Sequence, residues 1–200
     1  MSTDIELFAE KFMGDTWHPV PEPKKDRPKG RSSKRIFPTH SLDIGQPYEL
    51  FSLLSGQRIG MSAGLVELPR LFGGRGFPKD LSPYYRASLP KFYEKYGDDK
   101  GPSWLELREL IELDWDLPLL HHGYVEARYA GYFHPEKSFP KWFPKGGELY
   151  HGLICPLPVG ATRVEWSLPL REFVGCGEWF IEQLLALSTG AELRIIYWFS

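Results

Sequence analysis

The chain has 200 residues, of which 42% are hydrophobic, 15% aromatic and 25% charged. This length suits one domain, and such a chain buries enough surface for a self-sufficient core. The net charge of −2 gives no general argument for binding to DNA or to an anionic membrane. With 20 glycines and 18 prolines, the sequence predicts one turn-rich domain over residues 1–200.

The sequence carries none of the common markers of secretion, membrane insertion or catalysis. Its start lacks the basic and apolar regions of a signal peptide, and no apolar run is long enough for a membrane helix. Cys155 and Cys176 form neither a disulfide framework nor a zinc motif. Phosphate-loop, nucleophile-elbow and Cys-x-x-Cys motifs are also missing. We therefore expect a cytoplasmic protein without a cofactor.

The expected secondary structure has an α+β order, with a mostly antiparallel sheet and three to four helices. Residues 4–11 alternate polar and apolar side chains, as in a half-buried strand, and residues 17–20 are its expected hairpin partner. An apolar segment over residues 48–54 follows a proline and precedes a glycine, which favours a short helix.

Two longer helices are predicted in the middle of the chain. The first runs over residues 83–97 and is expected to be interrupted by Pro90. The second opens at Ser103, which has capping-box spacing to Glu106. Leucines then recur at helical spacing, so the pattern predicts an amphipathic helix over residues 103–116.

The C-terminal part predicts further strands and one helix. Alternating or apolar runs favour strands at residues 124–130, 149–155 and 163–168. A helix is expected over residues 178–187. The apolar segment 193–199 predicts a final strand that is buried inside the sheet.

Two long loops stand out by their composition. The loop over residues 21–46 contains a basic segment, 24–35, with seven basic residues and one acid. This segment is either a phosphate-binding arm or a solvated loop, and the absence of interleaved aromatic residues favours the loop. Residues 134–147 form an aromatic, basic and proline-rich excursion on the surface, in which Trp142 stands between lysines.

Some polar residues suggest chemistry without defining it. Arg75 lies in a Gly-Gly-Arg-Gly turn, which can present one arginine or simply form a tight loop. His121 and His122 precede an expected strand, where neighbouring side chains point to opposite faces, so at most one of them joins a shared metal site by that route. Asp114 and Asp116 form an acidic helix end, which suits either a cation or arginine partners.

Short motifs recur along nearly the whole chain in a recognisable order: Asp4-Ile5, Tyr48-Glu49-Leu50-Phe51 with Gly56-Gln57-Arg58, Arg75-Gly76-Phe77-Pro78 with Leu81-Ser82-Pro83, Ser103-Trp104-Leu105, Asp114-Trp115 and Leu193–Phe199. This order resembles a group of small bacteriophage and bacterial proteins that begin Met-Gly-x-Asp-Ile-His. Glu6 stands where that group usually has histidine. The group has no established activity, so the resemblance implies a phage origin and no catalytic residues.

A phage origin favours a non-enzymatic protein that binds a molecule of the host. The leading hypothesis is a sponge-like protein that counters host immunity by binding a small anionic ligand, such as a nucleotide-derived signal. Stacking and phosphate binding need aromatic and basic side chains. The candidate ligand-binding residues are Arg58, Arg75, Trp115, His121, His122 and Trp142.

Two alternatives remain open at this stage. One is an inhibitor that binds a host protein through the aromatic residues 139–143, which have the composition of an interface hot spot. The other is a metal-dependent hydrolase that uses Glu6, Asp114 and Asp116 with the two histidines. The sequence does not favour DNA or membrane as a partner, and it leaves a homo-oligomer open.

Overall fold

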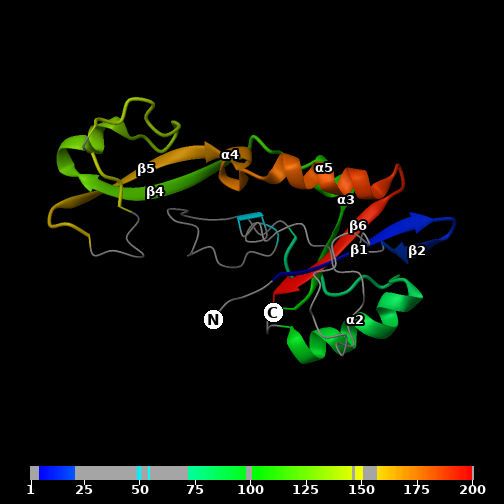
Figure 1. Cartoon of the computed structure of the whole chain (residues 1–200). Helices are drawn as coiled ribbons and strands as arrows, with labels where there is room; N and C mark the ends of the chain where they lie inside the picture. Colours follow the sequence, from blue (N-terminus) through cyan, green and yellow to red (C-terminus); the bar gives the residue numbers. More distant parts are fainter. Residues whose placement is uncertain are drawn as a thin grey trace, which may run out of the picture. The chain divides into compact units, whose positions relative to one another are not determined.

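A computed structural model describes residues 5–20, 49–50, 54, 72–97, 101–145, 147–150 and 157–199 (Figure 1). Its elements confirm the α+β class, with antiparallel strands and few helices. Tertiary contacts divide the chain into two compact units, and each is described here by itself. Unit 1 comprises Met1–Gln46, Phe72–Leu113 and Glu178–Ser200, and unit 2 comprises Pro47–Leu71 and Asp114–Gly177.

Unit 1 is built on a four-stranded antiparallel sheet of order β2-β1-β6-β3. The predicted N-terminal hairpin is confirmed as β1 (Ile5–Met13) and β2 (Thr16–Pro19). The predicted C-terminal strand is also confirmed, because β6 (Leu193–Phe199) pairs with β1 on one side and β3 (Ser103–Glu106) on the other. Every residue of β6 is buried, so the apolar C-terminal segment forms the centre of the sheet.

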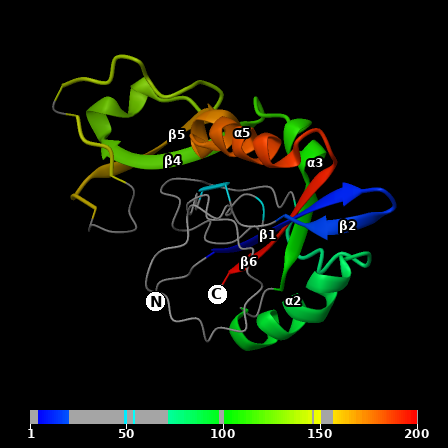
Figure 2. The ribbon, with the colours of Figure 1, turned by 45° about the vertical axis from the view of Figure 1, so that its right-hand side comes forward.

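Helices cover both faces of this sheet (Figure 2). Helix α2 (Pro83–Tyr96) lies on one side, and its buried side chains pack on a cluster that includes Phe8 and Trp198 from the strands. Helices α3 (Leu107–Ile111) and α5 (Gly177–Ser188) lie on the other side. The helix predicted over residues 178–187 is thereby confirmed.

A buried arginine network joins four segments of unit 1. The Arg194 guanidinium on β6 donates from Nε and Nη2 to one carboxylate oxygen of Glu10, at 2.8 and 2.6 Å. Its Nη1 contacts the Asp80 carboxylate at 2.6 Å, and the guanidinium lies 4.0 Å from the centre of the Trp17 ring. Arg194 and Glu10 are both buried, so each depends on the other for charge compensation.

The helix predicted over residues 103–116 is wrong in both its start and its length. Ser103–Glu106 forms strand β3 instead, because it pairs with β6 over four residues. The helix begins only at Leu107, and the backbone N–H of Glu106 donates to the Glu109 carboxylate at 2.9 Å. A cap of the expected type therefore exists, but it lies three residues further along the chain.

The predicted interruption of helix α2 at Pro90 is wrong. Helix α2 runs through Pro90, and it opens at Ser82, whose hydroxyl accepts from the Tyr85 N–H at 3.3 Å. Leu89 and Phe92 flank the proline and are both buried in the same core cluster. This packing holds the helix together across the missing backbone donor.

Unit 2 is built on one long antiparallel hairpin. Strand β4 (Pro118–Glu126) pairs with β5 (Ala161–Pro169) over nine residues, followed by the short helix α4 (Leu170–Val174). The strand predicted at 163–168 is confirmed within β5. The strand predicted at 124–130 is confirmed for residues 124–126, but β4 ends at Glu126 and the 3-10 helix η2 (Ala127–Tyr132) replaces the rest.

Several predictions fall wholly or partly outside the described residues. They concern the basic loop 21–46, Arg58 and most of the segments 48–54 and 149–155. Of the expected helix, Glu49, Leu50 and Leu54 are helical, and of the expected strand, Tyr150 bridges to Tyr124. Within the described ranges, no helix is long and apolar enough to cross a membrane.

Candidate functional site

One face of the β4–β5 hairpin carries the aromatic core of unit 2. Strand alternation places Val125 of β4 on this face with Val164 and Trp166 of β5, and all three are buried. Leu168 of β5 and mainly aromatic side chains from the segment between the strands pack against them; those from the segment are Tyr129, Ala130, Phe133, Phe139, Phe143 and Leu149. The excursion after η2 therefore folds back on the hairpin.

Two phenylalanines anchor residues 139–145, which we name the aromatic loop. The ring of Phe139 lies 5.4 Å from that of Trp166, in an edge-to-face contact. The ring of Phe143 lies 5.5 Å from that of Phe133 and 5.9 Å from that of Phe139. Such edge contacts are favourable arrangements for aromatic pairs, so the loop is held by its own side chains.

Backbone contacts restrain the ends of this excursion. The Lys137 carbonyl accepts from the Ser167 N–H at 2.8 Å, which ties the start of the excursion to β5. The Gly147 N–H donates to the Pro144 carbonyl at 2.9 Å and closes the turn after the loop. A Cβ at position 147 would lie 2.8 Å from the Phe143 ring, so only glycine fits this approach without a shift.

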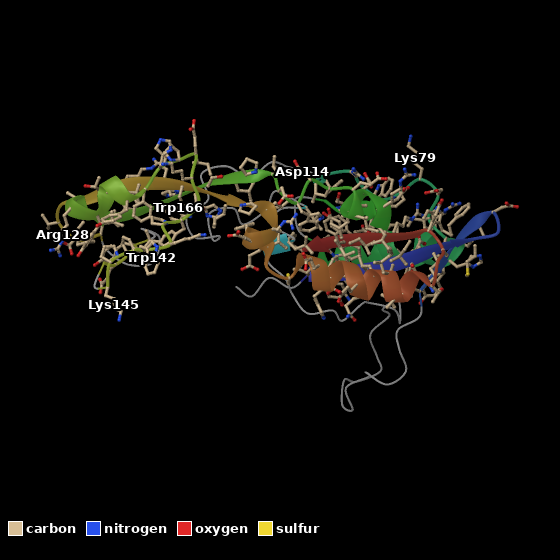
Figure 3. The ribbon with its side chains drawn as sticks, turned by 90° about the horizontal axis from the view of Figure 1, so that it is seen from above. Lys79, Asp114, Arg128, Trp142, Lys145 and Trp166 are labelled. Atoms are coloured by element: carbon tan, nitrogen blue, oxygen red, sulfur yellow. The ribbon has the colours of Figure 1, made fainter. Side chains whose placement is uncertain are left out.

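Trp142 is the one aromatic side chain of the aromatic loop that points outward. It is 87% exposed, whereas Phe139 and Phe143 are half-buried. Figure 3 shows Trp142 and Lys145 at the same edge of this unit, with Trp166 on the hairpin. Lys141 and Lys145 are exposed, and no described carboxylate forms an ion pair with either of them. The loop thus presents a large apolar side chain between uncompensated positive charges.

Arg75 lies in a glycine turn of unit 1, and its environment differs from that of Trp142. Its guanidinium forms two parallel hydrogen bonds with the Glu109 carboxylate, at 2.9 and 2.8 Å. It also lies 4.8 Å from the centre of the Phe72 ring and 5.3 Å from that of Trp104. Arg75 therefore fastens its glycine turn to helix α3, and its charge is already compensated.

The titration of Glu109 agrees with this pairing. Desolvation alone would raise the pKa of its carboxyl, but the hydrogen bonds from Arg75 and from the Glu106 N–H outweigh it and leave that pKa lowered. Glu109 is thus a carboxylate at neutral pH, and its negative charge cancels that of Arg75. An incoming phosphate would meet a neutral pair rather than a free cation.

The remaining described candidates all lie in unit 2, with different surroundings. Trp115 packs against Gly177, where an added Cβ would lie 2.5 Å from the indole ring. His121 is buried and stacks on Trp166 at 5.8 Å, whereas the His122 ring meets that of Tyr124 at 6.2 Å. The two histidines occupy opposite faces of β4, as the alternation predicted.

The described residues do not assemble the carboxylate and histidine site of the hydrolase alternative. In the described ranges, no group of three or more His, Cys, Asp or Glu side chains could hold a metal ion. Asp116 pairs with Arg171 at 2.9 Å, and the Asp114 carboxylate accepts from the Asp116 N–H at 3.0 Å. The acidic segment thus has the arginine partner that the sequence analysis weighed as its alternative.

Two residues that determine the surroundings of these candidates were not predicted from the sequence. Glu109 compensates the charge of Arg75, and the ring of Phe133 contacts both phenylalanines of the aromatic loop. A signal for Phe133 exists in hindsight, since three phenylalanines recur within a proline-rich polar segment and such residues tend to pack together. The chain matches no protein-family model, no curated protein and no solved structure.

Proposed function

We propose that this chain is a non-enzymatic binding protein that recognises a protein partner through the aromatic loop, with Trp142 as the anchor. The observation that carries this proposal is the contrast within the loop, where Trp142 is 87% exposed while its aromatic neighbours pack inward. Tryptophan is among the residues most enriched at the energetic centres of protein interfaces.

The energetics favour such a role. An indole buries on the order of 200 Å² in an interface, which corresponds to a gross gain of about 5 kcal/mol. Ordering a flexible loop would consume part of this gain. Here the contacts of Phe139 and Phe143 have already restrained the loop, so little further ordering is needed on binding.

The charge around the anchor specifies the kind of partner. Lys141 and Lys145 are exposed and uncompensated, so an acidic rim around an apolar pocket is the complementary surface. The resemblance to phage proteins supports a host factor as that partner, with the protein acting as its inhibitor. Cytoplasmic action in the host belongs to the same proposal.

A small anionic ligand is the second candidate, because Trp142 and its flanking lysines can also stack on a base and neutralise a phosphate. Binding of a nucleotide-derived immune signal would use this loop. Arg75 does not support that candidate, since Glu109 already holds its guanidinium in two hydrogen bonds. We therefore rank a protein partner first.

Affinity capture from bacterial lysate tests the proposal with three forms of the full chain: the unaltered protein, Trp142→Ala and Tyr84→Ala. Tyr84 is a matched control, because it is an exposed aromatic residue on helix α2 of unit 1. We expect one bacterial protein to be enriched by the unaltered chain and by Tyr84→Ala, and to be lost with Trp142→Ala.

Equal recovery of the captured protein with Trp142→Ala would contradict the proposal. Native mass spectrometry of the same forms with cyclic and linear nucleotides decides the second candidate. A nucleotide adduct that disappears with Trp142→Ala, in the absence of any captured protein, would replace the protein partner by a small anionic ligand.

A further inference from the structure

Helix α5 has an exposed face opposite its core face. Phe180, Leu184 and Ser188 are buried, and their spacing places them on one side of the helix. At 100° per residue, the exposed side chains fall within about 120° of the helix circumference. These residues are Glu178, Trp179, Glu182, Leu185 and Ala186.

This face combines large apolar side chains with acidic ones. Trp179 and Leu185 are each 46% exposed, although a solvent-facing helix surface is normally charged or polar throughout. Glu178 and Glu182 are exposed one turn apart, and no described cation forms an ion pair with either of them. We name these five residues the α5 face.

The α5 face and the aromatic loop are chemically complementary. The loop presents one exposed indole between Lys141 and Lys145, while the helix presents apolar surface beside two glutamates that are one helical turn apart. The lysines are four residues apart in the loop. Burial of the indole against Trp179 and Leu185 would bring both pairs of opposite charges within reach of one another.

We infer that the aromatic loop of one copy of this chain docks on the α5 face of a second copy, with Trp142 against the apolar residues and the lysines against the glutamates. The contact joins two different surfaces, so it is heterologous. This inference goes beyond the proposed function, since it uses the same loop but needs no other protein.

Sedimentation velocity of the full chain across a dilution series tests the contact. The unaltered protein associates as its concentration rises, and added salt weakens the association because exposed charges contribute. Trp142→Ala weakens it by about 30-fold or more, as expected for an interface hot spot. Reversal of the lysines (K141E with K145E) or of the glutamates (E178K with E182K) weakens it as well.

Combination of both reversals in one chain restores association, because the opposite charges again face each other with exchanged signs. The matched control for the lysine reversal is Lys91→Glu with Lys95→Glu, which makes the same change of net charge on the exposed surface of α2 and leaves association unaltered. Thermal melting of each form verifies that the fold persists.

A monomer at every concentration would overturn the inference, and so would failure of the combined reversal to restore association. These outcomes are distinguishable from failure of the proposed function. If the chain is monomeric but still captures a bacterial protein through Trp142, only the self-association is contradicted. If the combined reversal restores association but Trp142→Ala still captures the bacterial protein, only the partner proposal is contradicted.

Discussion

Two regions of the molecule place a cation beside a tryptophan, and they use this pair in opposite ways. In unit 1, Arg75 lies on Trp104 and is compensated by Glu109, so the pair fastens a turn to a helix. In unit 2, Trp142 is exposed beside Lys141, which has no described acidic partner. The same residue types are structural where charge and surface are satisfied, and available for binding where they are not.

The interior of unit 1 contains a more fully compensated cation, Arg194. Arg194 is held between two carboxylates and the Trp17 ring, and Glu10 is completely buried. A buried ion pair contributes little net stability over apolar residues, but removal of one partner leaves an unpaired buried charge. Mutations in the compensated network should therefore lower stability, whereas mutation of Trp142 should lower binding.

The largest expected effect is on the stability of unit 1. Glu10→Ala leaves the Arg194 guanidinium buried without its main partner, and should lower the free energy of unfolding by about 3–5 kcal/mol. Urea denaturation measures this change. The matched control is Arg171→Ala, which breaks an exposed pair with Asp116 and should cost less than about 1 kcal/mol. Equal losses of unfolding free energy in the two variants would show that the network of Arg194 and Glu10 is not desolvated.

A smaller effect is expected at the support of the aromatic loop. Gly147→Ala places a Cβ 2.8 Å from the Phe143 ring, and the resulting shift should cost about 1–3 kcal/mol. Gly131→Ala is the control, because nothing lies within 4 Å of its added Cβ. Hydrogen exchange of the loop amides should quicken in the first variant only. Unchanged exchange would mean that Phe143 does not restrain the loop.

Acid should weaken unit 1 through a carboxyl group with a lowered pKa. Desolvation would raise the pKa of Asp80, but hydrogen bonds from Arg194 and Trp17 outweigh it and leave that pKa lowered. This contribution is complete above the unfolded pKa of about 3.9 and is lost as the pH falls through the lower folded value. Urea denaturation against pH should therefore show a decline below about pH 4 that is smaller in Asp80→Asn. An identical decline in both forms would exclude Asp80 as its source.

Local patterns predicted the elements that depend on local physics. The hairpin of β1 and β2, helix α5 and the buried strand β6 follow from alternation and helical spacing. Ser103–Glu106 was predicted as a helix because its cap spacing is favourable, yet it pairs with β6 as an edge strand of the sheet. That outcome depends on a partner about 90 residues away, which no local pattern encodes.

The candidate site could be predicted only in part for a similar reason. The prolines and lysines around Trp142 indicated an exposed side chain, and the structure places it 87% exposed. The packing of Phe139 on Trp166 joins distant segments, so the sequence did not reveal that the loop is anchored. Arg75 was predicted as a ligand-binding residue, but its compensation by Glu109 spans 34 positions and removes the free charge.

Under the proposed function, Trp142 contributes to binding and not to folding. The most direct test measures the unfolding free energy and the partner capture of Trp142→Ala in parallel with those of Tyr84→Ala. We expect the unfolding free energy of Trp142→Ala to stay within about 0.5 kcal/mol of the unaltered protein, as for an exposed residue, while its capture of the partner is lost. Retained capture, or a loss of stability as large as that of a core aromatic residue, would contradict the account.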